Sequence, residues 1–376
     1  IFDDEKINLA WDSSFNTKCG IATYSSYLLD KIKEPNIDIK IYANYDDEIV
    51  YDLLEDGVIR CWENRFDENN ELLVDEIVKQ NSTHALINFN FGFFSMKNLA
   101  YIIEKLKEKG IKIIIIFHSV QDVTIKGIES SLSWIKESLQ KVDKILVHNI
   151  SDLNIFKSFG LEKNAKLFPH GIKIYPNREK QQEQIKQKLN IANKFILASY
   201  GFLLPHKGIK ELIQAYKEVV NTKPDTHLLL VNSLYPAPAS YEYQKECQEE
   251  ITNLNLESNI TMINDFLSDE DTAIHLSCSD LLVMPYKQTQ ESSSAAVRNA
   301  IAVKKPVLCT PSNIFYDVHQ VVHFMDSYLP NDMAKNIVEL IEDDTKLHSK
   351  QEIQEKWIQE YDFSNIIYAL LNHIKK

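Results

Sequence analysis

A glutamate and three serines stand directly before a helix-forming run, in the stretch ESSSAAVRNAIAVKK at residues 291–305. Serine is unfavourable inside a helix but favourable at its start, where its oxygen and the unpaired backbone N–H groups can meet an anion. Lys207 stands in a comparable place, within YGFLLPHKGIKELI (200–213), where a strand-like run leads into an amphipathic one. A lysine there can act as a point charge on phosphate, aided by the helix start. The two stretches predict a phosphate-binding site.

Short apolar runs alternate with longer amphipathic segments along the chain, and each apolar run predicts a buried strand. The runs are KINLAW (6–11), DIKIYA (38–43), HALINFN (84–90), KIIIIFH (112–118), KILVHN (144–149), KLFPH (166–170), FILASYG (195–201), HLLLVN (227–232), ITMIND (260–265), DLLVMPY (280–286) and PVLCTP (306–311). Strands that alternate with helices predict an α/β fold with parallel sheets, whose ligands lie at the carboxyl ends of the strands.

A polar segment at about 171–194 has no strand-like core and divides the chain. A chain of 376 residues also exceeds one ordinary core, so two domains are expected. We predict a Rossmann-like domain at residues 1–175, a second at 176–355, and a C-terminal helix at 356–376 that packs back on the first domain. The two Rossmann-like domains are expected to face each other across a cleft that holds the ligand.

The charge and the cysteines exclude several classes of protein. The formal net charge is −13 and the sequence pI is about 5.4, which argues against a nucleic-acid partner. Five scattered cysteines without a C-x-x-C pair argue against a disulfide framework or a zinc site and predict a reducing cytoplasm. The opening IFDDEKINLAW lacks the apolar core of a signal peptide, and its first residue is not methionine, as in a chain trimmed from a longer one.

The chain has nine glycines, and five of them fall where a predicted strand ends or a helix begins. These are Gly20, Gly92, Gly171, Gly201 and Gly208. Glycine at such a place lets the backbone approach a ligand closely or take a positive φ, although each one alone is equally a turn residue. Neither G-x-G-x-x-G nor G-x-x-x-x-G-K-[ST] occurs, which weakens simple dinucleotide and NTPase interpretations.

Five stretches, in order along the chain, carry a resemblance to a known family. They are CGIATYSSYLL (19–29), IIIIFHSV (113–120), LFPHGI (167–172), YGFLLPHKGIKELI (200–213) and ESSSAAVRNAIAVKKPVLCTP (291–311). The chain resembles GT-B glycosyltransferases over about residues 6 to 320, and most of all the retaining group of glycosyltransferase family 4 with its mannosyltransferase-like members. The resemblance implies that the first domain binds the acceptor and the second binds the nucleotide-sugar donor.

The resemblance implies a role for each matching position. His118 and Glu291 are the expected catalytic residues, with His118 beside the transferring sugar and Glu291 at its hydroxyl groups. The residues expected to bind the donor are Gly20, Gly201, Lys207, Ser293, Ser294, Arg298 and Asn299. The residues expected to bind the acceptor are Asn90 and Gly92, in NFNFGFF (88–94), whose aromatic side chains are equally compatible with a core strand.

The chain departs from the family pattern at two positions. Asn299 stands where the second motif glutamate usually contacts the ribose, and Phe202 stands where an arginine often accompanies the lysine. Arg298 is a candidate replacement for that arginine, and a surface role for it is equally open.

Two metal-site patterns are weak. Asp269-Glu270-Asp271 resembles a D-x-D motif, but Ser268 and Asp271 fit a helix capping box better. His319 and His323 have the four-residue spacing of helical zinc ligands, but DVHQVVHF lacks the accompanying glutamate. No metal and no cofactor are expected.

The resemblance implies a metal-independent, retaining glycosyltransferase in polysaccharide or glycoconjugate synthesis. It would move a hexose from a nucleoside-diphosphate sugar, with GDP-mannose favoured, to a saccharide or lipid-linked acceptor. It would work in the cytoplasm, with peripheral contact at the inner face of the membrane left open. The alternative is a catalytically silent GT-B partner subunit that binds a glycan or protein, which Asn299 and Phe202 favour. A GT-B epimerase or phosphorylase is a third possibility.

Overall fold

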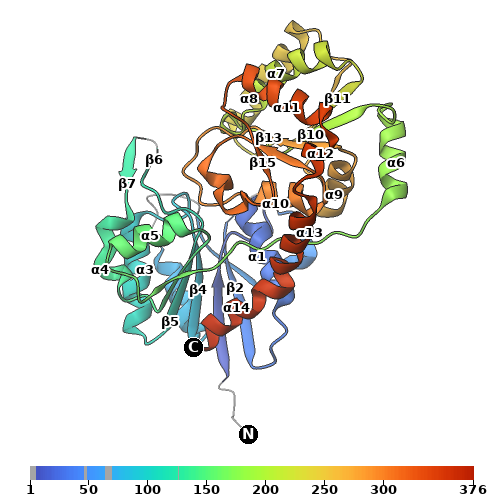
Figure 1. Cartoon of the computed structure of the whole chain (residues 1–376). Helices are drawn as coiled ribbons and strands as arrows, with labels where there is room; N and C mark the ends of the chain where they lie inside the picture. The colour runs from blue at the N-terminus through green and yellow to red at the C-terminus, as the bar shows by residue number, and fades with distance from the viewer. Residues whose placement is uncertain (1–5, 46–48, 64–69, 126) are drawn as a thin grey trace. The chain divides into compact units, whose positions relative to one another are not determined.

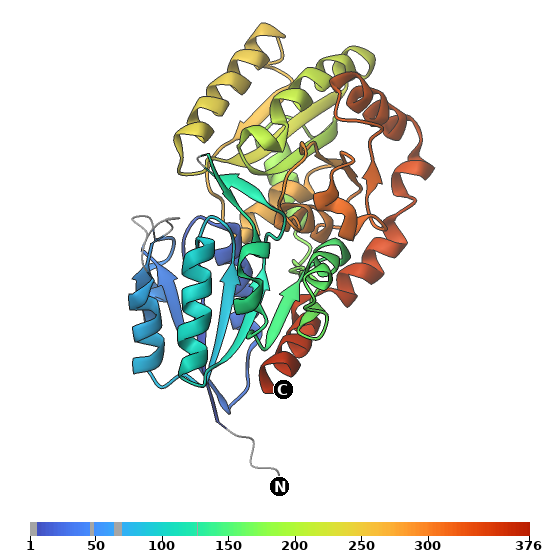
Figure 2. The ribbon, with the colours of Figure 1, turned by 90° about the vertical axis from the view of Figure 1, so that its left-hand side faces the viewer.

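The computed structural model describes residues 6–45, 49–63, 70–125 and 127–376. The chain forms two compact α/β units, each of which appears in two views in Figures 1 and 2. Unit 1 comprises Ile1–Gly171, Gln290–Ser293 and Phe363–Lys376, and unit 2 comprises Ile172–Thr289 and Ser294–Asp362.

Unit 1 is built on a seven-stranded sheet in the order β3-β2-β1-β4-β5-β8-β9, in which every neighbouring pair is parallel. Its strands are β1 (Ile7–Asp12), β2 (Ile37–Asn44), β3 (Val58–Trp62), β4 (His84–Phe89), β5 (Lys112–Phe117), β8 (Lys144–Val147) and β9 (Ala165–Leu167). A separate antiparallel hairpin joins β6 (Val123–Ile125) to β7 (Ile128–Ser130).

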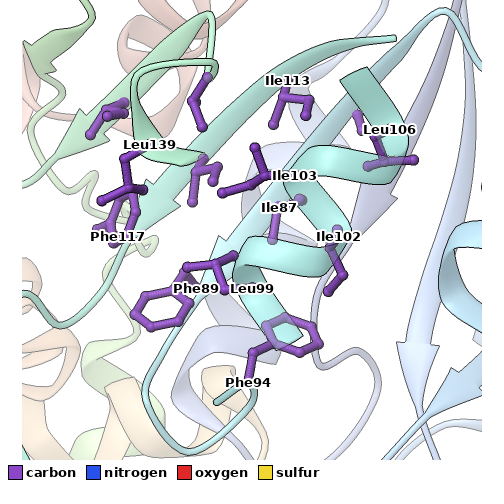
Figure 3. Close-up of a cluster of buried hydrophobic side chains, with 14 of the residues drawn as sticks. Ile87, Phe89, Phe94, Leu99, Ile102, Ile103, Leu106, Ile113, Phe117 and Leu139 are labelled. Carbon is purple, nitrogen blue, oxygen red and sulfur yellow. The ribbon is translucent and has the colours of Figure 1, made fainter. Parts of the chain in front are cut away.

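Helices cover both faces of this sheet. They are α1 (Gly20–Lys31), η1 (Asp52–Glu55), α2 (Glu71–Lys79), α3 (Met96–Glu108), η2 (Leu132–Ile135), α4 (Lys136–Leu139), α5 (Ile150–Ser158) and α14 (Phe363–Lys375). Figure 3 shows the apolar side of α3, where Leu99, Ile102 and Ile103 meet Ile87 and Ile113 of the sheet. Residues spaced by three and four positions share one face of a helix, so this pattern buries one side of α3.

Unit 2 has a six-stranded sheet in the order β12-β11-β10-β13-β14-β15, again with parallel neighbours. Its strands are β10 (Phe195–Phe202), β11 (Thr226–Ser233), β12 (Ile260–Ile263), β13 (Leu281–Met284), β14 (Val307–Cys309) and β15 (His323–Phe324). The two parallel sheets confirm the predicted pair of Rossmann-like folds.

The sheet of unit 2 has a separate apolar core on each face. Side chains of α7, α8 and α11 build one core, and side chains of α10, α13 and η4 contribute to the other. The helices of this unit are α6 (Glu179–Lys188), η3 (Pro205–Lys207), α7 (Ile209–Thr222), α8 (Pro238–Asn253), α9 (Asp269–Ser277), α10 (Ala295–Ala302), η4 (Asn313–Val318), α11 (Pro330–Glu342), α12 (Asp344–His348) and α13 (Gln351–Glu360). Within the described ranges, no helix combines the length and apolarity that a bilayer span requires.

The last helix of the chain returns to unit 1. Helix α14 packs against α1, and the ring of Phe363 lies 5.2 Å from that of Tyr27 and 5.8 Å from that of Tyr24. A Cβ on Gly171 would lie 2.5 Å from the Phe363 ring, so the chain passes very close to the start of this helix. Leu370 on the inner side of α14 is fully buried, whereas Tyr368 is 67% exposed.

This contrast along α14 predicts the effect of two substitutions on stability. Leu370→Ala should lower the free energy of unfolding by about 2–5 kcal/mol, because it leaves a cavity in packed apolar surroundings. Tyr368→Ala should change it by less than about 0.5 kcal/mol, because the ring is exposed. Urea denaturation followed by circular dichroism checks both variants. An equal effect of the two would contradict the docking of α14 through its Leu370 face.

Candidate functional site

The predicted phosphate-binding loop of unit 2 begins at the end of β10. Lys207 is the last residue of η3, and only 8% of it is exposed. Its Nζ lies 4.0 Å from the centre of the Tyr286 ring. A cation over an aromatic face is attracted by the ring quadrupole. The loop therefore holds the Lys207 charge beside Tyr286, a residue that the sequence analysis did not select although it ends the DLLVMPY run.

Two glycines allow this close arrangement. Gly208 has φ +70°, and a Cβ there would lie 2.0 Å from the carbonyl oxygen of Pro285. Gly201 has φ +133°, and a Cβ there would lie 2.9 Å from the Tyr286 Oη and 3.6 Å from the Cβ of Ala296. A side chain at either position would combine backbone strain with a clash. These glycines bring the ends of β10 and β13 next to the first turn of α10.

Helix α10 starts where the serine run predicts a helix start. Ser294 is its N-cap, and the Ser294 Oγ accepts a hydrogen bond of 3.1 Å from the Val297 backbone N–H. Ser294 is buried and belongs to unit 2, whereas Ser293 is half-buried and belongs to unit 1. The side chain of Ser294 thus accepts a hydrogen bond from one of the backbone N–H groups that have no partner within the helix at its N-terminus.

Arg298 is a residue of α10, and its buried side chain stabilises the start of that helix. Its guanidinium pairs with Asp317 at 2.5 Å and donates a 3.0 Å hydrogen bond to the Ser294 carbonyl oxygen. The guanidinium carbon also lies 5.9 Å from the centre of the Trp357 ring. Because Arg298 is only 3% exposed, the expectation of a surface role was wrong. The carboxylate of Asp317 compensates the positive charge of the Arg298 guanidinium, which was expected to bind the donor phosphates.

The two positions that depart from the family pattern have partners within unit 2. Asn299 donates a 3.3 Å hydrogen bond to the hydroxyl of Tyr200. Burial raises the pKa of Tyr200 to about 12. The ring of Phe202 stacks on Phe266 with 6.1 Å between centres and meets Tyr235 edge-on at 5.1 Å. Where the resemblance expects an arginine, the structure therefore has a cluster of aromatic rings.

In unit 1, His118 directly follows β5 and is held at both ring nitrogens. Its Nε2 lies 3.0 Å from Asn88 Oδ1, and its Nδ1 lies 3.3 Å from His148 Nε2. Burial, with a smaller contribution from the neighbouring His148, lowers the pKa of His118 well below its usual value. Asn88 and His148 were missed from the sequence, although both fall at the ends of predicted strands.

Glu291 lies near His118 in the same unit. The Ser292 backbone N–H donates a 3.3 Å hydrogen bond to the His118 carbonyl oxygen, and the Asn149 side chain donates one of 2.7 Å to the Ser292 carbonyl oxygen. Glu291 itself forms an isolated antiparallel bridge with Ser119 and is exposed. The structure thus brings the two expected catalytic residues onto neighbouring backbone segments of unit 1.

The remaining predicted residues of unit 1 lie at element ends. Gly20 is the first residue of α1, and nothing lies within 4 Å of the place where its Cβ would be. Asn90 forms a turn after β4, in which its Oδ1 accepts a 2.8 Å hydrogen bond from the Gly92 N–H. The phenylalanines of NFNFGFF are buried in the core of unit 1, which confirms the core-strand alternative for those side chains. The acceptor-binding roles of Asn90 and Gly92 stay predictions.

The weak metal patterns have ordinary structural explanations. Ser268 caps α9 by accepting a 3.1 Å hydrogen bond from the Asp271 N–H, which confirms the predicted helix cap. Asp269 and Glu270 are paired with Lys173 and Arg178. The described part of the chain contains no group of histidine, cysteine and acidic side chains that could hold a metal ion.

The chain is similar to one protein family over part of its length and to several solved structures. Residues 181–360 match the family described as glycosyl transferases group 1. No curated protein sequence matches the chain. HepE from Anabaena, solved in complex with UDP, is 17% identical with a TM-score of 0.76, covering 97% of this chain and 98% of that chain.

Two further solved structures are similar over nearly their whole length. A glycosyltransferase from Rickettsia africae is 15% identical with a TM-score of 0.76, covering 98% of each chain. Sucrose-phosphate synthase from Thermosynechococcus elongatus is 15% identical with a TM-score of 0.76, covering 97% of this chain and 98% of that chain. At such identities the likeness shows the fold, and it confirms the predicted GT-B fold class.

The clash at Gly208 predicts the outcome of one substitution. Gly208→Ala should destabilise the protein by several kcal/mol, because a Cβ would meet the Pro285 carbonyl oxygen while the backbone is left-handed. Gly110→Ala is the matched control, since Gly110 has φ +74° and nothing within 4 Å of its Cβ position. Gly110→Ala should lower the free energy of unfolding by only about 1 kcal/mol. Thermal unfolding measures both, and equal losses would show that the approach to Pro285 is unimportant.

Proposed function

We propose that the protein is a glycosyltransferase that uses a nucleoside-diphosphate sugar as donor. One observation carries the proposal: the stretch that matches glycosyl transferases group 1 contains the Lys207 loop and the start of α10. A lysine and a helix start together suit a diphosphate, which gains negative charge as it leaves the sugar. We assign the diphosphate to Lys207 and to the backbone at Ser294, next to Gly201.

The sugar is assigned to residues of unit 1. His118 and Glu291 offer an imidazole and a carboxylate on neighbouring segments, and the carboxylate can accept hydrogen bonds from sugar hydroxyl groups. The anomeric carbon becomes positively charged in the transition state of glycosyl transfer. A neutral His118 suits this position better than an imidazolium, and its lowered pKa favours the neutral ring. We propose that transfer occurs with retention and that Glu291 binds sugar hydroxyl groups instead of acting as a nucleophile.

The donor is a hexose carried on a nucleoside diphosphate. HepE has been solved with UDP, with UDP and glucose, and with UDP-glucose, which supports a uridine nucleotide as a candidate beside GDP-mannose. The acceptor is proposed to be a saccharide or a lipid-linked saccharide in polysaccharide or glycoconjugate synthesis. No metal is assigned a role, since Lys207 and the helix start provide the stabilisation that the leaving group needs.

A second candidate is a catalytically silent partner subunit with the same fold. The observation that favours it is the aromatic cluster of Phe202, Tyr235 and Phe266 in place of the expected arginine, together with Asn299 in place of a glutamate. A silent subunit of this kind would bind no nucleoside diphosphate, so binding separates the two candidates.

Lys207→Met tests the donor site. The substitution should weaken binding of the preferred nucleoside diphosphate by about 10- to 100-fold, because it removes a charged partner of the phosphates. Isothermal calorimetry with GDP, UDP, ADP and dTDP, in the presence of EDTA, gives the affinity and the preferred base. Lys210→Met is the control, because Lys210 lies nearby in the first turn of α7 and pairs with Glu246 at 3.1 Å. Absence of binding to all four nucleotides would favour the silent partner.

Glu291→Gln tests the sugar site separately. We expect kcat for transfer to fall by about 10- to 100-fold, because an amide replaces a carboxylate that accepts hydrogen bonds from sugar hydroxyl groups. Affinity for the free nucleoside diphosphate should stay unchanged, since that ligand has no sugar to transfer. The assay measures initial rates with the preferred nucleotide sugar, and NMR of the product anomer tests retention. A loss of nucleotide affinity equal to the loss in rate would contradict the assigned role.

A further inference from the structure

Two histidines at the carboxyl ends of β5 and β8 form a continuous row with two oxygen atoms. His118 Nε2 lies 3.0 Å from Asn88 Oδ1, and His118 Nδ1 lies 3.3 Å from His148 Nε2. At the other end, His148 Nδ1 lies 3.0 Å from the Phe168 carbonyl oxygen. All three contacts are within hydrogen-bonding range, so each requires one hydrogen atom.

Both ends of this row are acceptors. The Phe168 carbonyl oxygen can only accept. The orientation of the Asn88 amide is fixed by its Nδ2, which donates a 3.2 Å hydrogen bond to the Asp12 carbonyl oxygen. The Asn88 oxygen must therefore face His118. The hydrogen atoms of all three contacts have to come from the two imidazole rings.

The two rings carry too few hydrogen atoms when both are neutral. Each neutral imidazole has one N–H, whereas three contacts need three. A neutral His118–His148 pair thus leaves one contact without a hydrogen, and one added proton completes the row. A second added proton would place two like charges next to each other, which is strongly unfavourable.

We propose that His118 and His148 form a single unit that binds one proton, in which His148 is the positioning residue that fixes the ring and tautomer of His118. This inference rests on the proposed function for its effect on transfer, because it deepens the role assigned to His118. Two interacting groups of this kind titrate as a pair with shared macroscopic pKa values. Burial, with a smaller contribution from the neighbouring His148, lowers the pKa of His118 well below its usual value, so burial opposes the charged form of the pair.

The surroundings of the pair contain other titratable groups. The Tyr24 ring of α1 lies 4.9 Å from His118 and 5.6 Å from His148, and the His170 ring lies 5.2 Å from His148. His170 Nδ1 lies 2.8 Å from the Gly171 carbonyl oxygen. Groups on the other nearby elements are Asp152 of α5, Glu291, and His373 of α14, whose ring lies 6.5 Å from that of Phe168.

The protonation state of the pair should affect transfer in a defined direction. A positive charge beside a sugar that is itself becoming positive raises the barrier. We therefore expect kcat/KM to fall as the pH decreases through the pKa of the pair.

The test uses the full chain with 15N-labelled histidine and follows the imidazole nitrogens by NMR from pH 4 to pH 8. The expected result for the unaltered protein is one shared titration step seen at both His118 and His148. His148→Gln should change the apparent pKa and the tautomer of His118. The control His170→Gln removes a neighbouring ring outside the row and should leave His118 unchanged. Independent titration of the two histidines in the unaltered protein would overturn the proposal, whether or not the variants fold.

Activity provides a second readout. His148→Gln should move the low-pH limb of the kcat/KM profile and lower kcat/KM near neutral pH by about tenfold, as expected for loss of one buried hydrogen-bonding partner. His170→Gln should leave the position of that limb unchanged. If the protein transfers no sugar under any condition, the proposed function fails, and the NMR titration still decides whether the pair exists. An unmoved limb in His148→Gln would reject the positioning role.

Discussion

The close approach between Gly208 and the carbonyl of Pro285 sets the geometry of the loop that carries Lys207. Gly208 is the N-cap residue of α7 and Pro285 follows β13, so this contact fixes the helix against the end of a neighbouring strand. Lys207 precedes Gly208 and Tyr286 follows Pro285, which places the ammonium group over the ring. The left-handed φ of Gly208 is therefore what allows a cation and an aromatic face to meet at a loop of only a few residues.

The two units use the same principle with different chemistry. Parallel strands present their carboxyl ends along one edge of a sheet, so residues far apart in sequence become neighbours there. In unit 2, the ends of β10 and β13 contribute the lysine loop and Tyr286. In unit 1, the ends of β4, β5 and β8 contribute the row of Asn88, His118 and His148. One edge therefore suits an anion, and the other suits polar groups that exchange protons and hydrogen bonds.

The fold could be predicted because its signal is local. Every apolar run that predicted a strand overlaps one, since a buried parallel strand tends to be apolar on both faces. Strand β3 was missed because its sequence VIRCW contains Arg60, whose charge is paired with Glu55. The β6–β7 hairpin and β15 are too short to leave a pattern.

The candidate site was predictable only where its signal is a loop or a helix start. Lys207 and Ser294 were found because each stands between a predicted strand and a predicted helix. Tyr286 and His148 were missed because their importance lies in contacts with residues 79 and 30 positions away. Arg298 shows the same limit, since neither a phosphate nor a surface role anticipates a buried pair with Asp317.

A net charge of −13 is compatible with an anion site because the local field depends on how nearby charges are paired. The acidic residues around the start of α7 are matched by lysines: Glu211 pairs with Lys287 at 2.6 Å and Glu246 pairs with Lys210 at 3.1 Å. The ammonium group of Lys207 lies 4.0 Å from the centre of the Tyr286 ring, whose quadrupole attracts it. The acidity of the protein as a whole acts at long range and is screened by salt, whereas this arrangement acts within a few ångströms.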